Sequence, residues 1–223
     1  MPYLLVLMGP QGAGKGTQAA KLASRLGMST VATGDILRKV GESDTPLSRQ
    51  IRETQAAGRL VSDDVMAGII QERLAREDCK SGCILDGFPR TLPQAALLDQ
   101  FAEQHGFKVS AVIIVVQRDM LEKRLTGRRT CSVCGHIYNI YFKPSKDEGV
   151  CDLDGGALLM REDDNPAAIK KRLDLFDQMT LPLLDYYRKT GRLGEVDGEG
   201  DICAISDRIS SAVAALTAGA SGV

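Results

Sequence analysis

The chain has few histidines and almost no net charge. Its 28 lysines and arginines are balanced by 29 aspartates and glutamates, which gives a formal net charge of -1 at pH 7. Non-specific binding to nucleic acid draws on a strong basic excess, which is missing here, so we expect no nucleic-acid partner. The two histidines, His105 and His136, stand in no triad-like setting. A hydrolytic Ser-His-Asp site therefore has no support.

The chain also lacks a long hydrophobic run at its start. The apolar run from Tyr3 to Met8 is far shorter than the roughly 20 residues of a membrane span, and no basic residue precedes it as in a signal peptide. A buried strand explains the run, and we expect a cytoplasmic protein without a membrane partner. Hydrophobic residues make up 43% of the 223 residues and charged residues 26%, which is typical of one globular core with room for insertions.

Short apolar runs alternate with longer amphipathic stretches. The runs are Tyr3–Met8, 83–85 and 111–116, and a helical pattern follows the first of them from Thr17. Near the C-terminus, Asn165 and Pro166 supply an N-cap and a first-turn proline for a helix whose apolar face contains Ile169, Leu173 and Phe176. Pro182 should kink or end that helix, and residues 194–197 predict a last strand before a final helix. This alternation predicts an α/β fold in which helices cover a parallel sheet.

Two segments interrupt the alternation. Residues 32–61 are polar and expected to be helical, whereas residues 128–164 are rich in glycine, cysteine and aspartate. We interpret both as insertions into one core that consists of residues 1–31, 62–127 and 165–223.

A glycine-rich turn follows the first strand. Residues 9–17 read Gly-Pro-Gln-Gly-Ala-Gly-Lys-Gly-Thr and open the first helix. Glycines allow backbone N–H groups to surround a phosphate at a helix N-terminus, and Lys15 is the cation that reaches the outer phosphates. The usual P-loop has Ser or Thr directly after the lysine, but here Gly16 separates Lys15 from Thr17. We therefore expect Mg²⁺ to be held differently.

Three of the six cysteines cluster in the second insertion. Cys131 and Cys134 form one Cys-x-x-Cys pair, and Cys151 and Asp154 have the same spacing sixteen residues later. Three thiolates and a carboxylate suit a closed, structural zinc site, with His136 as the rival fourth ligand. A redox pair would leave the third cysteine and the aspartate unexplained. A zinc ribbon that binds nucleic acid is the competing class of function, and activity with ATP and AMP would exclude it.

The P-loop variant resembles that of the nucleoside monophosphate kinases, and further motifs resemble the long-form adenylate kinases in order along nearly the whole chain. These motifs are Thr-Gly-Asp-Ile-Leu-Arg at 33–38, Asp-Gly-Phe-Pro-Arg at 86–90 with Gln94, Gly-Arg-Arg at 127–129, Arg-Glu-Asp-Asp at 161–164 and Lys-Arg-Leu at 171–173. The resemblance implies a five-stranded, monomeric enzyme that reversibly converts ATP and AMP into two ADP with Mg²⁺. It also implies an AMP-binding insertion and a zinc-containing lid.

The resemblance also implies roles for individual residues. The residues implied for ATP are Gly12, Ala13, Gly14, Lys15, Gly16, Thr17, Arg124, Arg128, Ile137, Tyr138 and Gly200. Those implied for AMP are Thr33, Arg38, Arg59, Leu60, Val61, Gly87, Phe88, Pro89, Arg90, Gln94, Arg161 and Arg172. Catalysis would rest on Lys15, Arg90, Arg128, Arg161 and Arg172, because phosphoryl transfer mainly needs alignment and charge stabilisation.

Three assignments keep alternatives at this point. Asp86 ends an apolar strand and would contact Mg²⁺ through water, or else cap a helix. Asp163 and Asp164 either help the lid to close or cap the helix near Pro166. The activity could also be that of a related kinase with GTP as donor or another monophosphate as acceptor. A GTPase is disfavoured because the guanine-reading Asn/Thr-Lys-x-Asp motif is missing.

Overall fold

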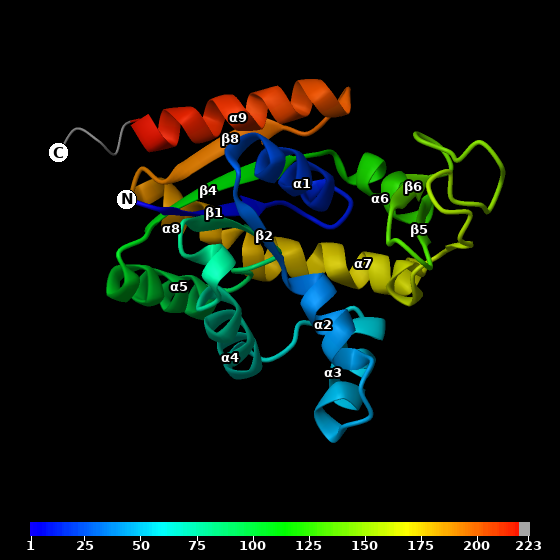
Figure 1. The fold of residues 1–223 in the computed structure, drawn as a ribbon, viewed down its shortest axis with the longest axis horizontal. Helices are drawn as coiled ribbons and strands as arrows, with labels where there is room; N and C mark the ends of the chain where they lie inside the picture. Colours follow the sequence, from blue (N-terminus) through cyan, green and yellow to red (C-terminus); the bar gives the residue numbers. More distant parts are fainter. Residues whose placement is uncertain (219–223) are drawn as a thin grey trace.

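Five parallel strands form the centre of the computed structural model, which describes residues 1–218 (Figure 1). The strands are β1 (Tyr3–Met8), β2 (Ser29–Ala32), β3 (Gly82–Asp86), β4 (Lys108–Val115) and β8 (Leu193–Asp197), in the order β2-β3-β1-β4-β8. The expected five-stranded parallel sheet is thus confirmed. Residues 219–223, the end of the predicted core, lie outside the described residues.

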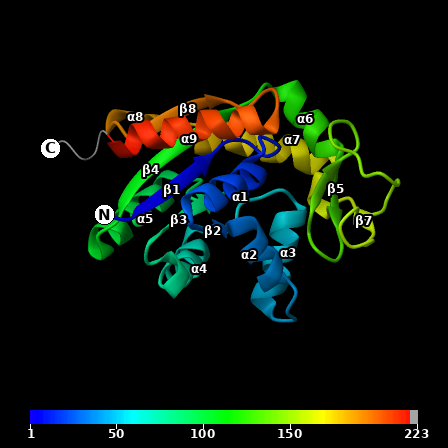
Figure 2. The same ribbon diagram turned by 45° about the horizontal axis from the view of Figure 1, so that its top comes forward.

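The two faces of the sheet are covered by different helices. In β1, Leu4, Val6 and Met8 pack with one hydrophobic cluster, while Leu5 and Leu7 pack with the other, because successive strand residues point to opposite faces. The first cluster includes residues of α4 (Asp63–Leu74), α5 (Leu92–His105) and α8 (Pro182–Lys189), and the second includes residues of α1 (Lys15–Leu26), α6 (Arg118–Thr126) and α9 (Ile202–Ala218). Figure 2 shows α9 above the sheet and α4 below it. This double cover is why the central strands are almost wholly apolar.

Glycines allow the turn after β1 to pass close to its neighbours. A Cβ atom at Gly9 would lie 2.9 Å from the carbonyl oxygen of Ile114, and one at Gly12 would lie 3.0 Å from that of Leu121. Both glycines also have positive φ angles. The turn therefore needs glycine at these two places, and it leads directly into α1.

The long C-terminal helical stretch is interrupted. Asn165 caps α7 (Pro166–Leu175) by accepting a hydrogen bond from the backbone N–H of Ala168 at 2.9 Å. A π-helical turn, Phe176–Thr180, follows, and α8 begins at Pro182. The predicted break at Pro182 thus falls between two helices. Short 3₁₀ turns cover Glu77–Cys79 and Glu162–Asp164.

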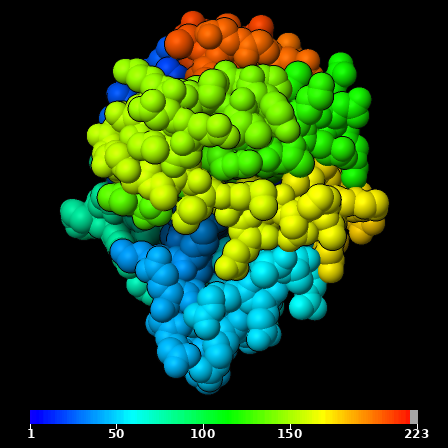
Figure 3. Space-filling model, turned by 90° about the vertical axis from the view of Figure 1, so that its right-hand side faces the viewer, coloured from blue at the N-terminus to red at the C-terminus, as the bar shows by residue number. Residues whose placement is uncertain are grey.

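Two segments extend from one end of the sheet. Residues 33–56 form α2 (Thr33–Gly41) and α3 (Pro46–Ala56), and residues 128–159 contain a three-stranded antiparallel sheet of β5 (Arg128–Cys131), β6 (Ile137–Asn139) and β7 (Leu158–Leu159). Seen end-on, the second segment lies above the first (Figure 3). Within residues 1–218, none of the helices has the length and apolar character needed to cross a bilayer.

Candidate active site

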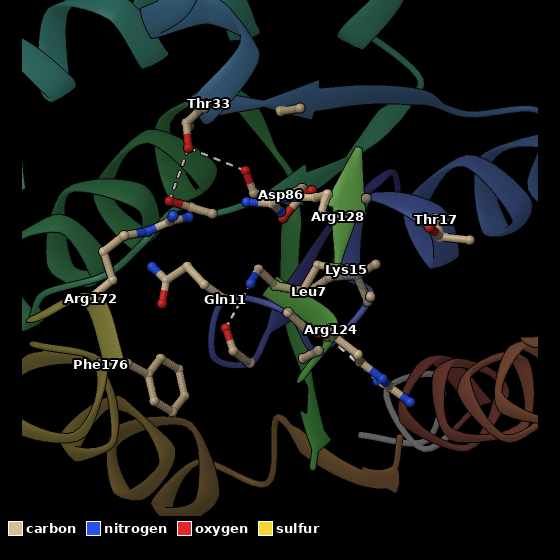
Figure 4. Close-up of a pocket in the computed structure, with 18 of the residues that line it drawn as sticks. Leu7, Gln11, Lys15, Thr17, Thr33, Asp86, Arg124, Arg128, Arg172 and Phe176 are labelled. Atoms are coloured by element: carbon tan, nitrogen blue, oxygen red, sulfur yellow. Dashed lines mark hydrogen bonds between the residues drawn. The ribbon is translucent and has the colours of Figure 1, made fainter. Parts of the chain in front are cut away.

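A cleft of about 740 Å³ opens at the carboxyl ends of the central strands. It is lined by the turn after β1, the end of β3, the α2–α3 segment, the β5–β6 hairpin and the start of α9 (Figure 4). Open parallel sheets bind ligands at this edge. The cleft lies within the range typical of small-molecule sites, about 300–1,000 Å³.

Lys15 holds the turn after β1 in shape. Its Nζ atom donates to the carbonyl oxygens of Gly9 at 2.8 Å and Pro10 at 3.0 Å. Burial lowers the pKa of Lys15 to about 8, against an opposing effect of Asp86. An ammonium group held in a glycine-rich turn at the N-terminus of α1 is a strong site for an anionic phosphate.

Asp86 lies beside the P-loop at the end of β3. Burial raises the pKa of its carboxyl group, and the positive charge of Lys15 opposes that rise. A Cβ atom at Gly16 would lie only 3.3 Å from Oδ2 of Asp86. The unusual glycine after Lys15 therefore makes room for this carboxylate, and Thr17 is displaced to an exposed position.

Backbone carbonyls on the acceptor side of the cleft are held by polar side chains. Thr33 donates from Oγ1 to the carbonyl oxygens of Asp86 at 3.2 Å and Gly87 at 3.0 Å. Nε of Arg90 also donates to the carbonyl oxygen of Gly87, at 2.7 Å. Arg38 forms an ion pair with Asp35. These bonds join α2 to the turn after β3.

Seven guanidinium groups from separate parts of the chain line the cleft: Arg38, Arg59, Arg90, Arg124, Arg128, Arg161 and Arg172. Burial lowers the pKa of Arg90, of Arg172 and of Arg161, the last to about 10. So much like charge in one buried place is costly unless anions bind there. The cleft is therefore built for several phosphates.

Asp164 and Asp163 partly neutralise two of these arginines. Asp164 has a fully buried side chain, and its Oδ2 accepts from Nε of Arg128 at 2.7 Å while its Oδ1 lies 3.3 Å from Nη1 of Arg172. Asp163 lies 2.9 Å from the same Nη1. Because Asn165 provides the cap of α7, the two aspartates serve to hold arginines rather than to cap the helix.

The loop between β8 and α9 forms the other end of the cleft. Nη2 of Arg124 donates to the carbonyl oxygen of Gly198 at 3.0 Å, and Nε2 of Gln18 donates to that of Ile202 at 3.0 Å. Gly200 lies between these two anchors and lines the cleft with Ile137 and Tyr138. The loop backbone is thus fixed from α1 and α6.

The cleft brings together nearly all residues that the sequence predicted for nucleotide binding. Phe88 is the exception, because its side chain is 1% exposed and packs in the core. The structure adds Gln11, which points into the cleft in Figure 4 and whose Oε1 has no hydrogen-bond partner among residues 1–218. The only sequence feature that could have identified Gln11 as a cleft residue is its position within the P-loop. The structure also adds Asp63, which contacts Gln94 and carries no motif of its own.

A second cluster of polar groups lies at the outer end of the β5–β7 sheet. Ligand atoms of Cys131, Cys134, Cys151 and Asp154 all lie within 4.8 Å of one another. The Sγ atoms of Cys134 and Cys151 are 3.7 Å apart, close to the roughly 3.8 Å edge of a tetrahedron with 2.3 Å zinc–sulfur bonds. The backbone N–H of Val133 donates to Sγ of Cys131 at 3.3 Å. These residues fit a tetrahedral metal ion.

The sheet, the P-loop and the arginine-lined cleft define a P-loop kinase that acts on small phosphorylated substrates. A family model described as adenylate kinase matches residues 7–192. The adenylate kinase of Moorella thermoacetica is 47% identical over 202 residues, covering 90% of this chain and 93% of that protein. That of Bacillus subtilis is 46% identical over 89% and 92%, and that of Archaeoglobus fulgidus is 45% identical over 89% and 92%. The chain belongs to the adenylate kinase family.

Proposed function

We propose that the cleft transfers the terminal phosphate of ATP to AMP, reversibly, with each nucleotide at one end. As a member of its family the chain is an ATP:AMP phosphotransferase, and a GTP donor or another acceptor is not favoured. The observation that carries the proposal is the convergence of Lys15 and seven arginines on one cleft. Hydrolysis of one phosphate ester would not need so extended a cationic surface.

The donor would occupy the P-loop end. Its phosphates would lie on the backbone of residues 12–17 with Lys15, and Arg124 and Arg128 would contact them from the other side. Its adenine would lie between the Ile137–Tyr138 strand and the backbone at Gly200, which are parts of the same cleft wall. The acceptor, AMP, would occupy the other end of the cleft, which is lined by Thr33, Arg38 and residues 59–61 and 87–94.

The chemistry needs alignment and charge more than proton transfer. The second pKa of a phosphate ester is about 6, so the attacking oxygen of AMP is already ionised near neutral pH. Negative charge in the transition state spreads over the migrating group and both flanking oxygens. Lys15, Arg90, Arg128, Arg161 and Arg172 would stabilise that charge from fixed positions. The buried Asp164 and the half-buried Asp163 keep Arg128 and Arg172 in place.

Magnesium and zinc would play separate parts. Asp86 offers hard oxygen ligands beside the P-loop and would hold Mg²⁺ through water, and the ion would neutralise phosphate charge. Zinc would fill the site of Cys131, Cys134, Cys151 and Asp154. Because protein atoms occupy all four positions there, its role is structural.

We also propose that residues 32–61 and 128–164 move over a core of residues 1–31, 62–127 and 165–223. Both segments contribute arginines to the cleft, so closure would bring those charges onto the phosphates and exclude water. We expect a monomer in the cytoplasm. A monomeric mass by light scattering, unchanged when nucleotide is added, would support that state.

A coupled assay across nucleotide pairs tests the function. ATP with AMP should give the highest kcat/KM, ahead of GTP as donor and of CMP, UMP or GMP as acceptor. Arg90→Ala should damage the use of AMP far more than ATP binding, whereas Arg188→Ala, a change at an exposed ion pair outside the cleft, should alter neither. Loss of ATP affinity with AMP use intact would mean that the two ends of the cleft are exchanged.

A further inference from the structure

Both ends of the Gln94 amide are hydrogen-bonded inside the protein. Gln94 lies in the first turn of α5, is 4% exposed and lines the acceptor end of the cleft. Its Oε1 accepts from the backbone N–H of Arg90 at 2.8 Å, and its Nε2 donates to Oδ1 of Asp63 at 2.7 Å. The amide is thus held between two elements, the turn after β3 and the start of α4.

These two partners permit only one orientation of the amide. An ionised carboxylate can only accept a hydrogen bond, and a backbone N–H can only donate one. Turning the Gln94 amide over would set its oxygen against the Asp63 carboxylate and its NH₂ against the N–H of Arg90. Both hydrogen bonds would be lost in a buried place, which is costly.

Asp63 is itself fixed. The hydroxyl of Thr91 donates to Oδ1 and Oδ2 of Asp63, at 3.1 and 3.2 Å. Thr91 caps α5, because its Oγ1 also accepts from the backbone N–H of Gln94 at 3.3 Å. Since that hydroxyl receives one hydrogen bond and gives its proton to Asp63, the carboxylate cannot turn away without a loss at the start of α5. Asp63 lies behind Gln94 and does not line the cleft.

We propose that Asp63 is a positioning residue that fixes the base specificity of the acceptor site through Gln94. The amide keeps one N–H and one oxygen lone pair for a ligand. Adenine offers the matching pair, a ring-nitrogen acceptor beside an amino donor, and glutamine pairs with it in this way. Hypoxanthine has the reverse pattern, a ring N–H beside a carbonyl oxygen, and would need the amide turned over. The inference rests on the proposed function, in which AMP occupies the end of the cleft lined by residues 87–94 and the Gln94 amide would contact the edge of its adenine.

Inosine monophosphate is the sharpest probe, because it differs from AMP at this edge alone. The test compares kcat and KM for AMP and inosine monophosphate at saturating ATP in Asp63→Asn. A side-chain amide at position 63 can pair with Gln94 in either orientation. The preference for AMP in kcat/KM should fall about tenfold, the scale of one charge-assisted hydrogen bond, while the KM for ATP stays unchanged. The remaining bond from Arg90 would preserve part of the preference.

Two further variants make the result decisive. Asp64→Ala removes a neighbouring, exposed carboxylate from the same helix turn and should leave the preference unchanged. Gln94→Ala should abolish most of the preference. If Gln94→Ala loses the preference for AMP over inosine monophosphate but Asp63→Asn keeps that preference within twofold of wild type, Asp63 has only a structural role and the inference fails. If Gln94→Ala keeps it, the proposed reading of adenine by Gln94 is wrong.

Discussion

Lys15 combines two contacts that differ in kind. In the structure its ammonium group closes the P-loop on the carbonyls of Gly9 and Pro10, and in the proposed reaction it would contact the transferred phosphoryl group. We expect Lys15→Met to keep the fold and to lower kcat by about a thousandfold, because a charge contact is lost in the transition state. Circular dichroism and the coupled assay would measure the two effects. If kcat of Lys15→Met stayed within tenfold of wild type, the assignment of residues 9–17 as the phosphate-binding P-loop would be wrong.

The lowered pKa of Lys15 predicts a pH dependence of ATP binding. Without nucleotide, burial lowers this pKa to about 8, so a growing fraction of the enzyme is neutral at Lys15 above that pH. The phosphates of ATP favour the charged form, so binding above pH 8 should take up a proton and affinity should fall by up to tenfold per pH unit. Calorimetry at pH 9 in buffers of different ionisation enthalpy measures the uptake. Lys15→Arg, which keeps its charge, should show no such slope in this range.

The lowered pKa of Lys15 affects folding in the opposite direction: higher pH weakens ATP binding but increases stability. Below pH 8 both the folded and the unfolded chain carry the proton on Lys15, and the desolvation penalty is fully present. Between pH 8 and the ordinary value of 10.5 the unfolded chain binds more protons than the folded one. The contribution of Lys15 to stability therefore rises with pH in that window.

At the residue scale, motifs predicted most of the cleft but not the contacts that hold it. Lys15 and Arg90 stand in contiguous motifs, so their place in the cleft could be foreseen from the sequence. Asp63 acts through Gln94, which lies 31 positions away, and only the packing of α4 against α5 brings them together. Phe88 shows the opposite case, since it stands inside a motif while its side chain fills the core.

At the scale of elements, the segment of residues 128–164, the proposed lid, has little core of its own. Its buried cluster consists of Cys131, Tyr138 and Cys151, with Leu158 packed against them. Metal binding should therefore supply much of the local folding free energy. The hydroxyl of Tyr138 lies 3.6 Å from Sγ of Cys151, so the proposed metal site would also support a residue that lines the cleft.

Removal of the metal tests this structural role. We expect about one zinc per chain by elemental analysis, and a lower Tm with a modest loss of activity after chelation or in Cys151→Ser. Cys203→Ser, at an exposed cysteine outside residues 128–164, should leave the zinc content, the Tm and the activity unchanged. Metal-free protein of unchanged Tm would contradict the structural role. Loss of all activity with fold and nucleotide binding intact would point to a catalytic metal instead.

Elements with a strong apolar pattern were predictable, and those with a weak one were not. The runs that became β1, β3 and β4 are buried on both faces and therefore almost continuously apolar. The edge strand β2 is only Ser29–Ala32, and its sequence, Ser-Thr-Val-Ala, gives little signal. The π-helical turn before Pro182 differs from an α-helix in its backbone hydrogen bonds, such as the one from the N–H of Leu181 to the carbonyl oxygen of Phe176 at 3.0 Å, and no residue pattern in the sequence predicts it.

For the whole molecule, closure should depend on the charge of the cleft. Without nucleotide, arginines on the core and on both outer segments repel one another, and phosphates would neutralise them. Small-angle scattering should show a smaller radius of gyration when two adenosines joined by five phosphates are added. Arg161→Gln should weaken that response, whereas Arg76→Gln, at an exposed ion pair remote from the cleft, should not. An unchanged radius in the wild type would contradict closure.

The ion pair between Arg128 and Asp164 joins the first strand of the lid segment to the turn just before α7. The chain therefore leaves the core and returns to it through one narrow neck, whose two sides are bonded to each other. What lies beyond a neck of this kind can vary in length and sequence without shifting the register of the central strands. A foreign segment grafted between these two residues should therefore keep the same attachment to the rest of the protein.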